Sequence, residues 1–214
     1  MSKPSSSTPI GARAWLAVCA GLAAGSLVAW WLPSAWLDWQ PARAASEPWR
    51  LVTAAWVHWS DMHLLANLAG AAVVAALGVV ARLPARAALA LAFAWPATHA
   101  ALWIEPALAH YGGASGVLHA AVAVVACWLV FGGEGRDVHD RLARWIGAAI
   151  GLGLVVKIGL EAPWAGPLAA GARTWDIAVV PLAHASGALA GAVAAVVALV
   201  VTALPVRQAR RHPR

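Results

Sequence analysis

The segment "YGGASGVLHAAVAVVACWLVF" (residues 111–131) joins a glycine-rich turn to an apolar run that carries no formal charge from Ser115 onward. The run is long enough to cross a hydrocarbon core, which needs roughly 17–25 helical residues. Inside a bilayer the backbone has no water to bind, so only helices and closed barrels can span it. The run is rich in Ala, Val and Leu without the alternation of a barrel strand, so it predicts a membrane-spanning helix.

Apolar runs of similar length recur along the whole chain. Of its 214 residues, 62% are hydrophobic and 11% are charged, whereas about a quarter of a soluble domain is charged. We predict an all-α membrane protein, a six-transmembrane-helix bundle with spans at 14–32, 62–81, 86–104, 115–131, 144–162 and 184–204. The expected organisation is a cytoplasmic N-terminal segment (1–13), one membrane domain (14–204) and a basic cytoplasmic tail (205–214).

The basic residues are distributed unevenly between the two sides of a six-span arrangement. One side carries Lys3, Arg13, Arg82, Arg86, Arg136, Arg141, Arg144, Arg207, Arg210, Arg211 and Arg214, and the other carries Arg43, Arg50 and Arg173. Cytoplasmic loops are enriched in Lys and Arg, so both termini are expected in the cytoplasm. The net charge of +6 is then explained by anchoring at a lipid bilayer, and no nucleic-acid partner is expected.

The first span has an alternative interpretation as a cleaved signal peptide, because "ARA" at 42–44 is similar to a signal-peptidase site. The run at 14–32 is longer than the usual apolar core of a signal peptide, roughly 7–15 residues, so we expect a retained helix. Cys19 and Cys127 both lie in apolar runs. We expect them to be small core residues rather than a disulfide.

Strongly polar side chains are predicted at a similar depth in three different spans. His63 and Asn67 lie in the outer half of the second span, while Ser115 and His184 lie at the outer ends of the fourth and sixth. Polar groups inside a span are costly and are candidates for function. A histidine can take the proton of a serine hydroxyl, and Asn, His and backbone N–H groups can stabilise an oxyanion. The set therefore suits acyl transfer.

Each of these residues also has a purely structural interpretation. The "GGASG" segment (112–116) could be a small-residue surface for helix packing. His63 and Asn67 are four residues apart, so they share a helix face and could hydrogen-bond for packing alone. His184 could reach for headgroups or water. All four residues are predicted at a similar depth in the membrane, and this agreement favours a single functional site that they form together.

At these residues the chain resembles the rhomboid family of intramembrane serine proteases. Four motifs occur in the family's order: "EPWR" (Glu47 to Arg50), "HWSDMHLLAN" with His58, His63 and Asn67, "GASG" (Gly113 to Gly116), and His184 followed by Gly187 and Gly191. The resemblance covers about residues 14–204 and implies a rhomboid-like bundle.

The resemblance also implies a role for each residue of the motifs. Ser115 would be the nucleophile and His184 the general base, working as a dyad without a carboxylate. His63 and Asn67 would form the oxyanion hole together with the Ser115 backbone amide. Such a dyad needs no metal or cofactor, so none is expected.

Other motif residues would support the site. Gly187 and Gly191 would let the sixth span pack closely on the fourth, and Trp49 and Arg50 would belong to a structured external loop. His119 stands where many rhomboids have a tyrosine that supports the catalytic histidine.

"SGVLHA" (115–120) and the pair Lys157 and Glu161 are similar to the rhombosortase branch of the family. That resemblance implies a bacterial inner-membrane enzyme with its active site facing the outer side. Its partners would be membrane-anchored proteins with a C-terminal Gly-Gly motif, a transmembrane helix and a basic tail. Cleavage could end in hydrolysis or in transfer to an amine.

Lys157 and Glu161 lie four residues apart, so we expect them to pair on one helix face. Two roles are open: a mutually neutralised pair that tolerates burial, or a border of the active-site cavity that holds the polar segment of the substrate.

Three other functions compete with this interpretation. A general rhomboid protease would cut other single-span proteins, and a rhomboid-like membrane chaperone would lack catalysis, although such a protein would normally lack the serine or the histidine. The third is a transporter or metal-handling protein. Metal ligands would need to converge, whereas His99, His110, His139 and His212 are scattered along the chain.

Overall fold

The computed structural model describes residues 10–132, 138–168 and 176–209, and within these ranges the chain is all-helical. The long helices are α1 (Ile10–Ala29), α4 (Asp61–Val80), α5 (Ala85–Ala100), α6 (Ser115–Phe131), α7 (Val138–Glu161) and α8 (Pro181–Ala209). Between α1 and α4 lie the short helices η1 (Ser34–Trp36), α2 (Pro41–Ala44), α3 (Arg50–Thr53) and η2 (Ala54–Trp56), and η3 (Ala101–Ile104) follows α5. Part of the predicted N-terminal segment (1–9), part of the basic tail (210–214), Lys3, Arg136 and Arg173 lie outside the described residues.

Five of the long helices are long and apolar enough to cross a membrane: α1, α4, α5 with its extension η3, α7 and α8. The sixth, α6, is an apolar helix of 17 residues. Most of its side chains are buried, among them Val117, Val124 and Val125. A helix that is surrounded by protein need not match the thickness of the lipid, which explains how a shorter helix fits here. The long apolar helices make the chain an integral membrane protein.

The helix ends differ from the predicted spans where proline is present. The sequence predicts the first span at 14–32, whereas α1 covers Ile10–Ala29 and the chain leaves the helix before Pro33, since a proline disfavours helical backbone in the residue before it. The last helix begins at Pro181 rather than at 184. A proline fits the first turn because its missing N–H would have no partner there.

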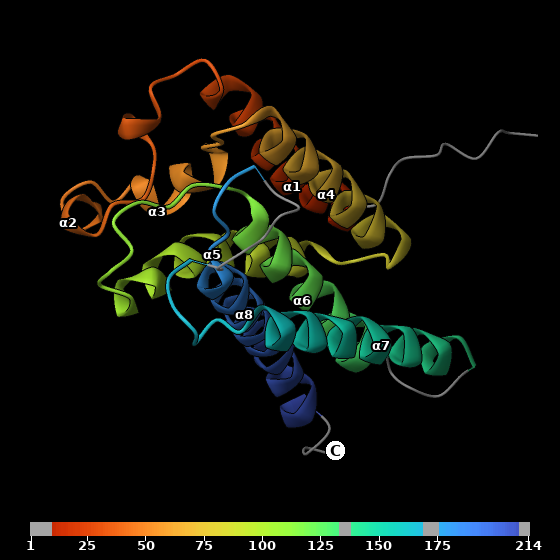
Figure 1. The fold of residues 1–214 in the computed structure, drawn as a ribbon. Helices are drawn as coiled ribbons and strands as arrows, with labels where there is room; N and C mark the ends of the chain where they lie inside the picture. Colours follow the sequence, from red (N-terminus) through yellow and green to blue (C-terminus); the bar gives the residue numbers. More distant parts are fainter. Residues whose placement is uncertain (1–9, 133–137, 169–175, 210–214) are drawn as a thin grey trace, which may run out of the picture.

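In the bundle, α6 lies at the centre and contacts α4, α5, α7 and α8. Figure 1 shows α1 and α4 side by side on one flank, with α7 and α8 on the other side of α6. The core follows this arrangement, since buried apolar residues of α1, α4, α5, α6 and α8 form one cluster. Trp15 of α1 is fully buried there, and its indole N–H donates to the Val74 carbonyl at 2.9 Å. The first helix is thus part of the packed bundle.

The contact between α6 and α8 is made by backbone. A Cβ added at Gly187 would lie 1.9 Å from the Gly116 carbonyl oxygen, and one added at Gly191 would lie 2.3 Å from the Ala120 carbonyl oxygen. Both separations are far below van der Waals contact. Glycine is therefore required at both positions for the helices to approach this closely, as is common where small residues line the contact between membrane helices.

The connection between α1 and α4 is fastened to the same end of the bundle as the start of α6. Trp39 and Tyr111 exchange two backbone hydrogen bonds of 2.8 and 2.9 Å. His99 Nδ1 lies 2.6 Å from the Leu51 carbonyl oxygen, which ties α5 to α3. These contacts give the segment before α6 a fixed platform.

We predict that Gly187→Ala separates α6 from α8 and destabilises the protein by about 3 kcal/mol, at the upper end of overpacking costs. Gly153→Ala on α7 is the matched control, because a Cβ there meets nothing within 4 Å. Thermal unfolding of both variants in detergent should show a lower Tm for Gly187→Ala alone. Equal Tm values would contradict the close backbone contact.

Candidate active site

Ser115 is the first residue of α6 and follows a turn that only glycine can make. Gly113 has a φ of 133°, which L side chains rarely adopt. A Cβ at this position would also lie 2.8 Å from His63 Nε2. The turn therefore presents the half-buried serine at the N-terminal end of a helix, where backbone N–H groups have no helical partner and carry a partial positive charge.

His184 lies in the first turn of α8 and reaches the serine. Its Nε2 atom is 2.9 Å from Ser115 Oγ, and the residue is buried. Gly187, one turn later on the same helix, is the point where α8 meets the backbone of α6. The helix contact thus determines how closely the imidazole approaches the hydroxyl.

The second nitrogen of His184 has an acidic partner that differs from the expectation. His184 Nδ1 lies 2.7 Å from Glu161 Oε2, and Lys157 Nζ donates to the other oxygen, Oε1, at 2.5 Å. The resemblance implies a dyad without a carboxylate, whereas the structure places a carboxylate within hydrogen-bonding distance of the imidazole. Sequence spacing pairs Glu161 with Lys157 but contains no sign of the contact between α7 and α8.

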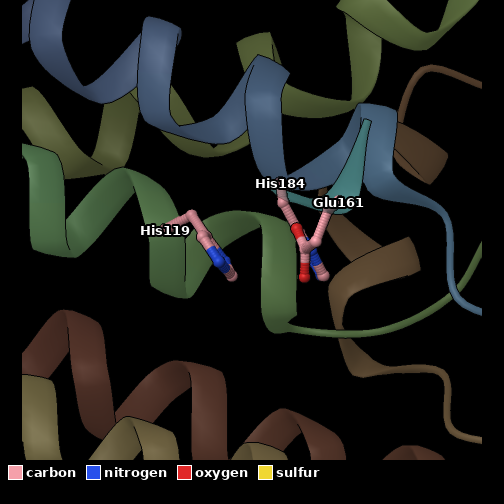
Figure 2. Close-up of side chains that lie close together, drawn as sticks. All are labelled: His119, Glu161 and His184. Atoms are coloured by element: carbon pink, nitrogen blue, oxygen red, sulfur yellow. The ribbon is translucent and has the colours of Figure 1, made fainter. Parts of the chain in front are cut away.

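His119 packs on the histidine ring from the α6 side. The two rings stack with centroids 4.2 Å apart and planes 12° apart. His119 Nδ1 lies 2.6 Å from the Ser115 carbonyl oxygen, to which its N–H donates. Figure 2 shows His119, Glu161 and His184 reaching one place from three helices. The stacking contact with His119 thus restricts the orientation of the His184 ring.

Among the residues that the structure describes, these three also form the group whose donor atoms converge enough for a metal ion, within 4.8 Å of one another. The geometry fits a hydrogen-bonded cluster better. Both nitrogens of His184 already face oxygen partners. The His119 and His184 rings are stacked, so their nitrogen lone pairs lie in two separate, nearly parallel planes, whereas a metal needs ligands that converge on one point.

His63 and Asn67 lie on the buried face of α4, next to the glycine turn. Ser60 caps this helix by accepting a hydrogen bond from the His63 backbone N–H at 3.1 Å. The Ser60 hydroxyl in turn donates to Asp176 Oδ1 at 2.7 Å, which links α4 to the segment before α8. Asp176 has no motif around it, so sequence reasoning missed it.

His58 supports His63 from the preceding loop, with ring centroids 4.7 Å apart. Burial lowers the pKa of His58, an effect that its hydrogen bond to the Trp56 carbonyl, 3.1 Å from Nδ1, partly offsets. The ring is therefore neutral near pH 7 and donates through Nδ1. A neutral neighbour adds no positive charge beside His63.

A cavity of about 300 Å³ opens over these groups. Its polar lining includes His63, Asn67, Ser115, His119, Glu161 and His184, and residues 177–180 form an apolar wall. Tyr111 lines it as well, and its hydroxyl donates to the Gly113 carbonyl at 3.1 Å. Burial raises the pKa of Tyr111 to about 12, so the hydroxyl stays protonated and holds the turn.

Arg50 and Trp49 lie away from the cavity. The Arg50 side chain is 1% exposed, and its guanidinium donates to Glu47 Oε2 at 2.6 Å, to the Asp38 carbonyl at 2.7 Å and to the Ala35 carbonyl at 3.0 Å. Trp49 is exposed. Arg50 therefore fastens the loop between α1 and α4, and Asp38 is a partner that sequence reasoning missed.

A family model, the Rhomboid domain, matches residues 45–201. The matched range includes every polar residue that lines the cavity. No curated protein matches the chain.

We predict that Arg50→Ala destabilises the protein by about 3 kcal/mol or more, because it breaks the ion pair with the buried Asp38 carboxylate, whose Oδ1 lies 3.2 Å from the guanidinium. Arg43→Ala is the matched control. Arg43 is 49% exposed and pairs with the same Glu47, so its loss should cost below about 1 kcal/mol. Denaturation in detergent measures both, and a similar loss for the two variants would contradict the structural role of Arg50.

Proposed function

The chain belongs to the rhomboid family, whose members are serine proteases that work within the membrane, and we propose that this chain cuts its substrates with Ser115 as nucleophile and His184 as general base. One observation supports the proposal above all. Ser115 Oγ lies 2.9 Å from His184 Nε2 at the edge of a cavity that also contains Asn67 and His63. A hydroxyl and a base at this distance are in position for proton transfer.

The proposed reaction begins when Ser115 Oγ attacks the scissile carbonyl carbon and its proton moves to His184 Nε2. The C–N bond then breaks, and the leaving amine takes that proton from Nε2. A water molecule then attacks the ester carbonyl and gives a proton to Nε2. The bond between that carbon and Ser115 Oγ breaks, the carboxyl product leaves, and Nε2 returns the proton to Ser115 Oγ. An amine that attacks the ester instead would give the transfer reaction.

The oxyanion of the tetrahedral intermediate needs donors that are already in place. The Ser115 backbone N–H is free at the start of α6, and Asn67 and His63 approach the same glycine turn. We propose these three groups as the oxyanion hole. The buried position of both α4 side chains keeps water from competing for them.

For the substrate we propose the C-terminal Gly-Gly anchor of membrane-tethered secreted proteins. A helical peptide bond is shielded by its own hydrogen bonds and must unwind before attack. Each glycine weakens a helix by roughly 1 kcal/mol relative to alanine. A Gly-Gly segment at the end of an anchor helix is therefore easy to expose. His119 and the Lys157–Glu161 pair, all at the cavity, are the features that the rhombosortase resemblance rests on.

We further propose that the enzyme resides in a bacterial inner membrane with six spans, both termini in the cytoplasm and the cavity on the outer side. The uneven distribution of Lys and Arg supports this orientation. Water for the second half of the reaction would then enter from the outer face.

We predict that a reporter with a Gly-Gly, helix and basic-tail anchor is cut when it is co-expressed with the wild-type enzyme and stays intact with Ser115→Ala or His184→Ala. The double variant should be no worse than either single one, because nucleophile and base act as one unit. Mass spectrometry of the new C-terminus locates the cut and reveals an amine adduct.

The matched control reporter replaces Gly-Gly by Ala-Ala. Cleavage of an unrelated single-span protein, with the Gly-Gly anchor left intact, would assign the chain to general rhomboid proteolysis. Undiminished cleavage by Ser115→Ala would end the serine-protease proposal.

For the topology, we predict that Ala109→Cys reacts with a membrane-impermeant maleimide in intact cells, in a background where Cys19 and Cys127 are replaced. Ala109 is exposed in the loop before α6. Ala81→Cys is the control. Ala81 follows the C-terminal end of α4, the end away from the cavity, so this cysteine should react only after permeabilisation. The reverse pattern would contradict the proposed orientation.

A further inference from the structure

We propose that Glu161 is a positioning residue that acts through His184 and completes a Ser115–His184–Glu161 arrangement. The inference rests on the proposed function, since it assigns a partner to the same base. It starts from a geometric fact: the two nitrogens of His184 face Ser115 Oγ at 2.9 Å and Glu161 Oε2 at 2.7 Å.

The first consequence concerns the tautomer of His184. An ionised carboxylate only accepts hydrogen bonds, so the Nδ1 atom facing Glu161 carries the proton. Nε2 is then left with its lone pair toward the Ser115 hydroxyl, which is the form that a general base requires. Without Glu161, the imidazole is free to place its proton on Nε2 and lose the capacity to accept.

The second consequence concerns the charge that develops during the reaction. When Nε2 takes the serine proton, the ring becomes an imidazolium, and the carboxylate next to it stabilises that cation. The proton on Nδ1 stays on Nδ1 and Glu161 stays ionised throughout. At 8% side-chain exposure for His184, little water competes for this role.

The position of Glu161 at the end of α7 supports a role in binding a residue of another helix rather than in stabilising α7 itself. Glu161 is the last residue of α7, where the helix dipole disfavours a negative charge. Two cationic or donor partners offset that cost, Lys157 one turn earlier and His184 on α8. Lys157 occupies Oε1 and thereby leaves Oε2 directed at the imidazole.

The chain path after Glu161 also constrains the carboxylate. Ala162 adopts a φ of 48°, in the left-handed region, so α7 ends abruptly there. The end of α7 lies next to the first turn of α8, where Glu161 meets His184, although the two helices otherwise contact each other sparingly. The Glu161–His184 hydrogen bond is thus a specific link rather than a by-product of extensive helix packing.

The test uses the full-length protein in detergent and a fluorophosphonate as probe, which needs no knowledge of the substrate. Ser115 Oγ forms a bond to phosphorus, the P–F bond breaks, fluoride leaves, and the serine proton passes through His184 Nε2 to solvent. We expect Glu161→Gln to lower kinact on the order of 10²–10³-fold, with KI nearly unchanged. The expected loss is smaller than the ~10⁴-fold effect of a fully buried triad carboxylate, because Glu161 is 25% exposed.

Three companion variants separate positioning from structural support. Glu161→Asp keeps the charge on a shorter stem and should recover at least tenfold over Glu161→Gln. Lys157→Gln keeps the carboxylate on His184 and should lose less than Glu161→Gln. Glu105→Gln, which removes a carboxylate of the loop after η3 that bonds the Ala107 backbone N–H, should label like the wild type. Tm values measured alongside show whether each variant is folded.

A double-variant comparison gives the most specific result. In a His184→Ala background, Glu161→Gln should cause no further loss, because a residue that acts through the imidazole has nothing left to act on. Three results would overturn the proposal and leave the serine nucleophile intact. Glu161→Gln could lower kinact equally in both backgrounds, or it could leave kinact at the wild-type value. Lys157→Gln could lower kinact as much as Glu161→Gln does. If Glu161→Gln does not fold, Glu161→Ala, which also removes the carboxylate, takes its place, and wild-type kinact for Glu161→Ala overturns the proposal. A folded wild-type protein that is not labelled at Ser115 would end the proposed function itself.

Discussion

The backbone contact between α6 and α8 sets the geometry on which the candidate site depends. Gly187 and Gly191 bring α8 so close to α6 that a single Cβ would meet carbonyl oxygen at 1.9 to 2.3 Å. His184 lies one turn before Gly187, so the same contact sets the 2.9 Å separation between its ring and Ser115. Because reaction rates are sensitive to misplacement on the order of 1 Å, the proposed chemistry at Ser115 would depend directly on this helix contact.

Around that contact, the polar side chains at the site form hydrogen bonds and ring contacts with one another. His119 donates to the Ser115 carbonyl and stacks on His184, while Glu161 joins His184 to Lys157. Unpaired polar or charged groups away from water are costly. The network therefore both stabilises the burial of these residues and holds each of them in one orientation, which is what a preorganised site requires.

The sequence alone predicted the parts of the molecule that follow from local rules. Lipid requires continuous apolar helices, so the helical class could be inferred from the apolar runs. The motifs around Ser115, His63 and His184 have fixed spacings, so the rhomboid family could be inferred as well. The family match over residues 45–201 confirms the family. The bond between Glu161 and His184 joins different helices, and nothing in local spacing encodes it. The same holds for Ser60 with Asp176.

The central claim is that the ends of α4, α6, α7 and α8 assemble a serine nucleophile with its base and oxyanion donors. An experimental structure of the full-length protein after reaction with a fluorophosphonate tests it most directly. The account predicts phosphorus bonded to Ser115 Oγ, its oxygen within hydrogen-bonding distance of Asn67 and the Ser115 backbone N–H, and His184 still bonded to Glu161. An adduct on another residue, or a His184 ring more than about 4 Å from the Ser115 side chain, beyond hydrogen-bonding reach, would contradict it.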